Sequence, residues 1–320
     1  MAQPRHRFVD AHGTRLHVAE QGEGPLVLLC HGFPESWYSW RHQLDALAAA
    51  GFRAVAPDMR GYGRSARPHE VEAYGQLELV GDMVGLVAAL GESEAVIIGH
   101  DWGAPVAWNA ALLRPDLFRA VGALSVPLSP APPLPPTQLL KALAGDRFHY
   151  ILYFQEPGKA ERELEADVRG WLEMFFYTAS GDVRIETTKL GQLAKTAKFS
   201  DGFAKPEKPP AWLSEQDLDF YAGEFERTGF RGGLNWYRNI DRSWQQMRAL
   251  RGARIRVPAL FVAGDRDGVV MANPQAVTDL AKTVPTLRRS EMLPGCGHWT
   301  QQERPQEVNR ILVEFLRSLG

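Results

Sequence analysis

A single aspartate stands in a setting where it could act as a nucleophile. Asp101 is the middle residue of GHDWG (99–103), which follows the apolar run AVII and precedes a stretch with helical spacing. Small residues on both sides allow a tight turn that exposes the central side chain. The free N–H groups at the start of the helix would favour the ionised carboxylate. Asp is also a common helix N-cap, so this pentapeptide alone leaves both interpretations open.

Two other loops carry residues that could assist such a nucleophile. His298 lies in PGCGHWTQQERP, a glycine-flanked loop between the last expected strand and the last helix, and a lone histidine is more often structural. Asp265 and Asp267 lie in GDRDGVV (264–270), directly after the apolar run ALFVA, where an aspartate can also simply cap a turn. A nucleophile, an orienting acid and a histidine base together form a hydrolytic triad. We expect Asp267 to be the acid, with Asp265 as its rival.

A fourth loop could stabilise negative charge on a reacting oxygen. HGFPESWYSW (31–40) directly follows the apolar run LVLLC. The backbone N–H groups of Phe33 in this loop, and of Trp102 beside the nucleophile, are the candidates for an oxyanion hole. The plain structural reading is a Gly-Pro turn between a strand and a helix, and it is compatible with this role.

These loops connect alternating strand-like and helix-like segments. A hairpin is expected around His12-Gly13, and helical spacing follows in SWYSWRHQLDALAAAG, LVGDMVGLVAALG and WGAPVAWNAALLRP. Continuous apolar strands that alternate with helices indicate a parallel sheet covered on both faces. The strands of this first part are expected at 26–30, 52–58, 95–99 and 118–126.

A proline-rich stretch then interrupts the alternation. VPLSPAPPLPPT (126–137) can continue neither a helix nor a central strand. The following residues are largely helical; GKAERELEADVRGWLEMFF (158–176) has apolar residues on one helical face, and Ser214 with Asp217 resembles a capping box. Strands return at 257–265 and near 287–293, before a closing helix.

We therefore expect a core formed by residues 1–127 and 251–320, split by a helical lid over residues 128–250. A strand, Gly-x-nucleophile-x-Gly and a helix, with acid and histidine following in that order, is the arrangement of the α/β-hydrolase fold. The predicted fold is a mostly parallel sheet of about eight strands, with helices on both faces and an inserted helical lid.

Composition narrows the class of protein. The 320 residues are 45% hydrophobic and 23% charged, with a formal net charge of −2, which gives no indication of a nucleic acid partner. No apolar stretch is long enough for a signal peptide or a membrane span. Cys30 and Cys296 are too few for a disulfide framework and form no metal-binding pattern. We expect a cytoplasmic protein without a metal or organic cofactor, and leave a homodimer open.

Longer motifs carry a resemblance to a known family. HGFPESWYSWRHQ, RGYGRS, GHDWGAPVAW and GHWTQQERP resemble the soluble epoxide hydrolases of the α/β-hydrolase superfamily, from about residue 7 to the end. HGFP and GHDWG also occur in dehalogenases, whereas YFQEPG with NWYRN is more specific to epoxide hydrolases. The resemblance implies that Tyr150 and Tyr237 hold the epoxide oxygen, with Tyr153 and Tyr221 as nearby alternatives.

The resemblance also implies a mechanism without a cofactor. Asp101 would open an apolar epoxide and form an alkyl ester, and water activated by His298 with Asp267 would release a vicinal diol. Three further residues match family positions near the active site, although ordinary turn or surface contacts would also explain them: His31, Glu35 and His100. The aromatic residues expected to line an apolar pocket are Phe33, Trp37, Trp102, Phe154 and Trp236.

Two rival functions fit parts of this pattern. A dehalogenase also uses an aspartate nucleophile but stabilises a halide with N–H donors, for which Trp102 and Trp236 are candidates. Paired tyrosines argue against it, because a departing halide needs no proton. A ligand-binding protein on the same fold can lose its catalytic groups, yet here each group has a candidate.

Overall fold

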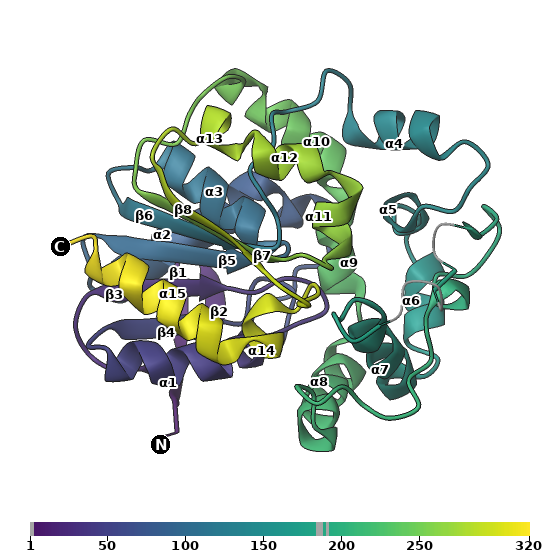
Figure 1. Ribbon diagram of the computed structural model, residues 1–320, viewed down its shortest axis with the longest axis horizontal. Helices are drawn as coiled ribbons and strands as arrows, with labels where there is room; N and C mark the ends of the chain where they lie inside the picture. The colour runs from purple at the N-terminus through teal and green to yellow at the C-terminus, as the bar shows by residue number, and fades with distance from the viewer. Residues whose placement is uncertain (1–2, 184–187, 190–191) are drawn as a thin grey trace.

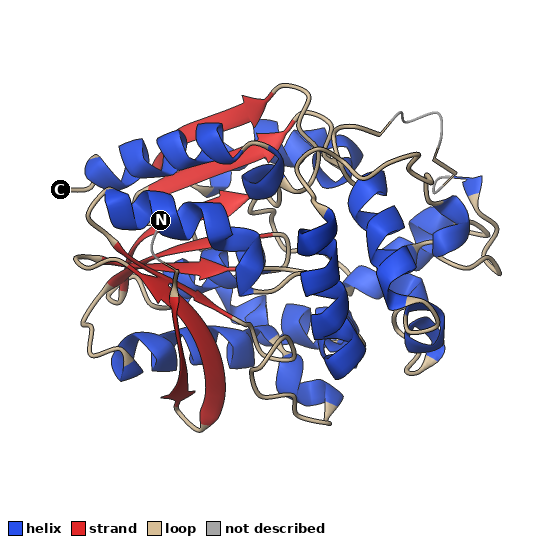
Figure 2. Cartoon of the chain, turned by 90° about the horizontal axis from the view of Figure 1, so that it is seen from below, coloured by secondary structure: helices blue, strands red, loops and turns tan. Residues whose placement is uncertain are grey.

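One mixed sheet forms the centre of the molecule in the computed structural model, which describes residues 3–183, 188–189 and 192–320 (Figure 2). Its strand order is β1-β2-β4-β3-β5-β6-β7-β8. The second strand pairs antiparallel with its two neighbours, and the remaining pairs are parallel. The strands are β1 (Arg5–Ala11), β2 (Thr14–Gln21), β3 (Leu26–Cys30), β4 (Arg53–Pro57), β5 (Ala95–His100), β6 (Phe118–Leu124), β7 (Ala259–Gly264) and β8 (Leu287–Leu293). The prediction of a mostly parallel sheet of about eight strands is confirmed.

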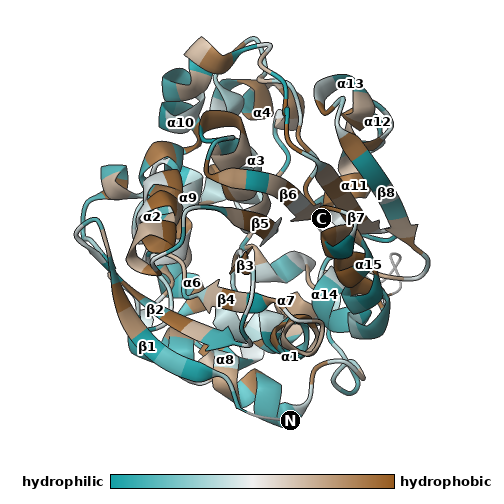
Figure 3. Cartoon of the chain, turned by 90° about the vertical axis from the view of Figure 1, so that its left-hand side faces the viewer, coloured by the Kyte–Doolittle hydropathy of each residue, from teal (hydrophilic) through white to brown (hydrophobic). Residues whose placement is uncertain are grey.

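The central strands are buried along their whole length. Every residue of β3, β5 and β7 is buried, because helices cover both faces of the sheet (Figure 3). Side chains alternate between the two faces: Leu26 and Leu28 belong to one apolar cluster, whereas Val27 and Leu29 belong to the other. These runs are therefore continuously apolar in the sequence, which is why they could be predicted.

Helices of the core flank the sheet and follow the predicted segments. Where a short helix was expected after β7, the chain forms three. The core helices are η1 (Trp37–Trp40), α1 (Arg41–Ala49), η2 (Val71–Tyr74), α2 (Gln76–Ala89), α3 (Gly103–Leu113), α11 (Gly268–Ala272), α12 (Pro274–Thr278), α13 (Leu280–Thr283), α14 (Thr300–Glu303) and α15 (Pro305–Arg317).

A helical insertion separates β6 from β7, although these two strands are hydrogen-bonded neighbours. It lies beside the sheet, at the right of Figure 1. The helix expected over 158–176 is in fact two, because the side chain of Asp167 accepts a hydrogen bond from Gly170 and starts a new helix. The predicted Ser214–Asp217 capping box is present. The insertion contains α4 (Pro136–Ala144), α5 (Tyr150–Tyr153), α6 (Lys159–Leu164), α7 (Val168–Thr178), η5 (Ser200–Gly202), α8 (Glu215–Thr228), α9 (Arg231–Arg238), α10 (Ile240–Gln246) and η6 (Met247–Leu250).

Across the described residues, no helix combines the length and the apolar character that crossing a membrane requires.

Candidate active site

Asp101 occupies a strained turn between β5 and α3. Its φ of 48° lies in the left-handed region, which non-glycine residues rarely adopt outside functional sites. The turn is tight enough to exclude side chains on both flanks. A Cβ on Gly99 would lie 2.0 Å from the carbonyl oxygen of Gly103, and a Cβ on Gly103 would lie 2.1 Å from that of Cys30. The two glycines of GHDWG are thus required by the geometry that presents Asp101.

Both oxygens of the Asp101 carboxylate have a partner. The backbone N–H of Phe33 donates to Oδ1 at 2.7 Å, and Nε2 of His298 lies 3.3 Å from Oδ2. Burial alone would raise the pKa of Asp101, but His298, His100 and the Phe33 N–H outweigh it and hold the pKa below its ordinary value. Asp101 is therefore ionised at neutral pH and can act as a nucleophile.

Asp267, and not Asp265, lies against the imidazole of His298. Both carboxylate oxygens of Asp267 are 3.1 Å from Nδ1 of His298. Asp267 also caps α11 by accepting a hydrogen bond from the Val269 N–H at 2.8 Å, so its structural interpretation as a cap is confirmed and is compatible with a role beside His298. Asp265 instead accepts a hydrogen bond from the Gly295 N–H at 2.7 Å.

His298 lies between two carboxylates, which sets its charge. Burial disfavours the imidazolium, yet Asp267 and Asp101 outweigh burial and raise the pKa of His298 well above its ordinary value. Burial likewise opposes ionisation of Asp267, but His298 and the Val269 N–H hold the pKa of this carboxyl below its usual range. Asp101, His298 and Asp267 therefore form one coupled set of charges.

Glu35 and His100 connect the Phe33 loop to the backbone of His298. Glu35 Oε2 accepts a hydrogen bond from the Gly32 N–H at 3.1 Å and lies 2.8 Å from Nδ1 of His100. Nε2 of His100 lies 2.7 Å from the carbonyl oxygen of His298. Both side chains are fully buried, so the alternative of ordinary surface contacts is wrong for them.

His31 fixes the same loop from its other side. Nε2 of His31 accepts a hydrogen bond from the Met59 N–H at 2.9 Å, and Nδ1 lies 2.9 Å from the Gly32 carbonyl oxygen. These two contacts define a neutral tautomer with its proton on Nδ1. Burial correspondingly lowers the pKa of His31.

Ser125 is a residue of this site that the sequence did not indicate. It follows β6 with a left-handed φ of 69°, and its Oγ lies 2.8 Å from the carbonyl oxygen of His298. It also contributes to the lowered pKa of Asp267. A positive φ at a serine has no sequence signal, because only the packed structure forces this conformation.

Two tyrosines of the insertion pack edge to face near the carboxylate of Asp101. Tyr150 starts α5 and Tyr237 lies in α9, with their ring centroids 6.0 Å apart and their planes 78° apart. Burial, with the nearby Asp101 charge, raises the pKa of both hydroxyls, to well above the ordinary value for Tyr237. Both phenols therefore stay protonated and can donate. Gln155 joins the two segments, since its Nε2 donates to the carbonyl oxygens of Ile151 at 2.9 Å and Tyr237 at 3.0 Å.

The alternative tyrosines are occupied elsewhere. The hydroxyl of Tyr153 donates to Glu163 Oε2 at 2.6 Å, and that of Tyr221 donates to Gln302 Oε1 at 3.0 Å. Of the four lid tyrosines considered, Tyr150 and Tyr237 are thus the pair brought close to the Asp101 charge.

Aromatic rings surround this pair. Phe33 packs edge-on against Tyr237 and Phe154, with ring centroids 5.5 and 5.9 Å away, and Trp102 packs edge-on against Tyr237 at 4.9 Å. The expectation that Trp37 belongs to this pocket is wrong, because η1 directs its ring to the sheet edge formed by β1, where it packs against His6.

Trp102 and Trp236 meet the needs of a halide site only in part. Trp102 is the N-cap of α3 beside Asp101, but the indole N–H of Trp236 already donates to the carbonyl oxygen of Arg60 at 3.0 Å. A halide would have to displace this hydrogen bond, which favours the epoxide interpretation over dehalogenation.

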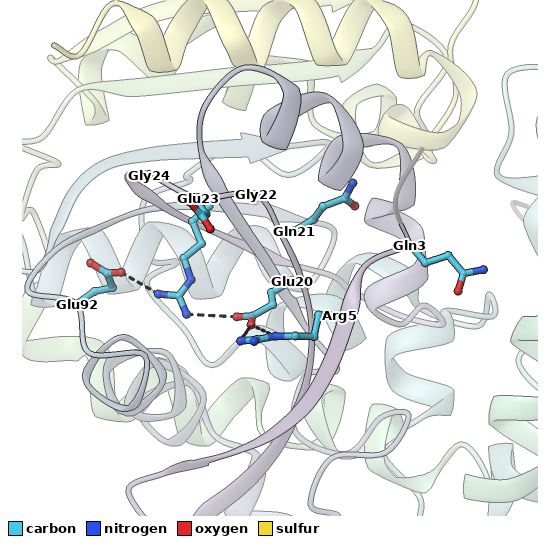
Figure 4. Close-up of a pocket in the computed structure, with 9 residues that line it drawn as sticks. Gln3, Arg5, Glu20, Gln21, Gly22, Glu23, Gly24 and Glu92 are labelled. Atoms are coloured by element: carbon cyan, nitrogen blue, oxygen red, sulfur yellow. Dashed lines mark hydrogen bonds and ion pairs between the residues drawn. The ribbon is translucent and has the colours of Figure 1, made fainter.

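A separate charged hollow of about 550 Å³ lies at the amino end of β4 (Figure 4). Asp101 instead follows the carboxyl end of the parallel strand β5. Several charged groups of the hollow are paired with one another: Arg53 lies 3.3 Å from Glu20 and 2.9 Å from Glu92. Among the residues that the structure describes, no group of three or more His, Cys, Asp or Glu could hold a metal ion.

Comparisons with known proteins identify the family of this chain. The α/β hydrolase fold family model matches residues 25–305. Epoxide hydrolase A of Mycobacterium tuberculosis is 48% identical over 326 residues, covering 100% of this chain and 99% of that protein. The structure of an epoxide hydrolase from an endophytic Streptomyces has a TM-score of 0.96 and 51% identity, covering 100% of this chain and 97% of that one. Epoxide hydrolase A from Mycobacterium thermoresistibile has a TM-score of 0.92 and 48% identity, covering 98% of both chains. With similarity at this level over its whole length, the chain belongs to the epoxide hydrolases of the α/β-hydrolase fold family.

Proposed function

We propose that this enzyme converts apolar epoxides to vicinal diols through a covalent ester on Asp101. The observation that carries the proposal is the placement of the Asp101 carboxylate between the Phe33 N–H and His298 Nε2. Oδ1 is held by the N–H, and Oδ2, which lies beside His298, attacks a ring carbon. Attack forms the C–O bond of the ester and breaks the C–O bond of the strained ring.

Tyr150 and Tyr237 would assist the departing oxygen. An alkoxide is too basic to leave unaided, and a protonated phenol can donate a hydrogen bond to it and deliver a proton. The raised pKa values of both hydroxyls support this role, because neither tyrosine ionises before the substrate arrives. The surrounding aromatic rings favour an apolar substrate.

Ester formation would convert His298 into a base. The free site holds two carboxylates around His298, and alkylation removes the charge of one, Asp101. The pKa of His298 then falls, and the proton that it releases restores the hydroxyl of the tyrosine that has given up its own. Neutral His298 can take a proton from water as the water attacks the carboxyl carbon of the ester, while Asp267 orients and stabilises the imidazole.

Collapse of the resulting tetrahedral adduct completes the reaction. Its negative oxygen, the former Oδ1, would accept hydrogen bonds from the N–H groups of Phe33 and Trp102. The bond between the carboxyl carbon and the ester oxygen, the former Oδ2, breaks, and the leaving alkoxide takes the proton from His298. The water oxygen replaces Oδ2 in Asp101, and the new carboxylic acid gives its proton to His298, which restores the ion pair of the free enzyme. One epoxide and one water thus give one diol.

We also infer that residues 128–250 act as a lid domain over a core of residues 1–127 and 251–320. This division is supported by the origin of the reacting groups. The nucleophile, acid and base lie on the core loops, whereas Tyr150 and Tyr237 belong to the insertion between β6 and β7. Substrate would then be enclosed where the two parts meet.

The test is the intact mass of a His298→Gln variant after brief incubation with styrene oxide. The expected result is a mass gain of one whole epoxide, because Asp101 still attacks but the ester persists without its base. The gain should be absent when Asp101→Ala is added. Absence of any adduct with this epoxide and with bulkier ones would overturn the proposal, and an adduct formed only with a bromoalkane would indicate a dehalogenase.

A further inference from the structure

The backbone on both sides of His298 is hydrogen-bonded to one buried carboxylate, that of Glu303 in α14. The backbone N–H of Gly297, directly before His298, donates to Glu303 Oε2 at 2.9 Å. The backbone N–H of Trp299, directly after His298, donates to Glu303 Oε1 at 3.0 Å. Glu303 therefore holds the chain on both sides of the histidine.

The same carboxylate reaches the insertion. The backbone N–H of Gly181, just beyond α7, donates to Glu303 Oε2 at 2.9 Å. The N–H of His298 itself donates to the carbonyl oxygen of Ala179 at 2.8 Å. Residues 179–181 of the insertion and residues 297–299 of the core are thus joined through Glu303 and one direct backbone hydrogen bond.

The two segments meet too closely for side chains between them. A Cβ on Gly297 would lie 2.2 Å from the Gly181 nitrogen, and a Cβ on Gly181 would lie 2.3 Å from the carbonyl oxygen of Gly295. Glycine on both sides allows the backbones to pack directly. The alignment of residues 179–181 with residues 297–299 is consequently fixed, because a shift of either segment along the other would place a side chain where only glycine fits.

The carboxylate of Glu303 is held chiefly by backbone N–H groups. Its residue is 7% exposed, and none of the described ion pairs includes its carboxylate. Burial raises the pKa of Glu303, and the three N–H donors counteract that rise. A buried carboxylate whose partners are backbone amides of the base loop and the lid needs an explanation beyond surface solubility.

We propose that Glu303 is a positioning residue for the hydrolysis step, which fixes His298 relative to the ester by joining residues 297–299 to residues 179–181 of the insertion. The proposal rests on the proposed role of His298 as the base. The Glu303 carboxylate is hydrogen-bonded to Gly181, Gly297 and Trp299 rather than to Asp101, Tyr150 or Tyr237, the residues proposed for ring opening. Loss of the Glu303 contacts should therefore slow ester hydrolysis much more than ester formation.

The test substitution is Glu303→Gln, which keeps size but changes hydrogen bonding. An amide offers one acceptor oxygen and one NH₂ donor, so its NH₂ group must face at least one backbone N–H. Ester formation and ester decay are measured separately by rapid quenching and intact mass with styrene oxide. A misplacement of the order of 1 Å can cost about 100-fold in rate, so we expect decay to slow by at least about tenfold. The rate of ester formation should stay within about threefold of the wild-type rate, so the ester should accumulate.

Two further variants make the result specific. Glu303→Asp retains the carboxylate and should recover part of the decay rate. Asp241→Asn is the matched control, because Asp241 also accepts a backbone hydrogen bond, from Thr137 at 2.9 Å, but joins two segments within the insertion. Both rates of Asp241→Asn should equal those of wild type.

The outcomes separate this proposal from the one on which it rests. Wild-type ester decay in Glu303→Gln, or an equal loss of both rates in Glu303→Gln and Glu303→Asp, would overturn the positioning role. If Glu303→Gln does not fold, the selective loss must appear in Glu303→Asp. Absence of an ester in His298→Gln would instead refute the covalent mechanism itself.

Discussion

Nε2 of His298 lies 3.3 Å from Oδ2 of Asp101, so the base and the nucleophile form one buried ion pair in the free enzyme. The negative charge of Asp101 helps to raise the pKa of His298, and the positive charge of His298 lowers the pKa of Asp101. Alkylation of Asp101 removes its negative charge, so it must lower the pKa of His298. In the proposed mechanism, this coupling would make His298 a base once the ester has formed.

Replacement of Asp101 by Asn should lower the pKa of His298. Asn is neutral and similar in shape, as the ester would be, so it removes one of the two carboxylates that raise the pKa against the opposing effect of burial. Titration of the imidazole by NMR in wild type and Asp101→Asn measures the change. Equal pKa values would mean that the two residues are not coupled.

The pH dependence of ester decay follows from the lowered pKa of His298 in the ester. Protonated His298 cannot accept a proton from water, so the decay rate should fall as the pH drops through the pKa of His298 in the ester. That pKa lies below the one in the free enzyme, because the Asp101 charge is gone. Single-turnover decay measured over pH should therefore stay fast at pH values where the free enzyme still holds a charged His298. Decay that titrates with the free-enzyme pKa would contradict this.

Asp267→Asn should separate the electrostatic role of Asp267 from its capping role. Asn also caps helices well, so the hydrogen bond from Val269 that starts α11 is retained. The charge against His298 is lost, and we expect ester decay to slow by about 10⁴-fold, as for the same substitution of the acid in a serine triad. Asp267→Ala should additionally cost about 1 kcal/mol of unfolding free energy, measured with denaturant.

Asp265→Asn is the matched control for that prediction. Its side-chain oxygen can still accept the hydrogen bond from Gly295, and Asp265 does not contact His298. Its ester decay rate should equal that of wild type. A loss as large as that of Asp267→Asn would show that the rate depends on the loop as a whole rather than on the Asp267 charge.

The parts of the site that the sequence could predict depend on local pattern. The apolar runs of β3 and β5 end directly at the Phe33 loop and at Asp101, so their side chains had to meet at one edge of a parallel sheet. The choice between Asp265 and Asp267 needed the structure. Both follow β7, and which one faces His298 depends on the turn that starts α11.

The parts that could not be predicted depend on contacts between distant segments. Glu303 and Gly181 are 122 positions apart, and neither has a local pattern that indicates its partner. Ser125 is an ordinary serine in the sequence and gains its contact with His298 only when β6 and β7 pair. Trp37 was misplaced because aromatic content alone does not say to which side a short helix directs a ring.

Single replacements of Tyr150 or Tyr237 by Phe should slow ester formation. Each removes one donor to the epoxide oxygen and leaves the ring in its aromatic packing. General acid assistance accelerates a reaction by about 10²–10⁴-fold. We therefore expect the double variant to form the ester about 100-fold more slowly than either single variant. Rapid quenching reports formation, and the decay rate of the ester should be unaffected. A double variant that forms the ester at the wild-type rate would exclude the tyrosines as donors.

Gly103→Ala should destabilise the fold strongly at the turn that presents Asp101. The added Cβ would lie 2.1 Å from the carbonyl oxygen of Cys30, and a backbone atom cannot rotate away. Overpacking of this kind costs about 3 kcal/mol of unfolding free energy, or more, measured by denaturant titration. Gly81→Ala in α2 is the control, because nothing lies within 4 Å of its added Cβ. Since glycine is a poor helix former, that change should stabilise the protein by about 0.5–1 kcal/mol. Equal effects of the two substitutions would mean that the close approach of Gly103 to β3 does not limit the turn.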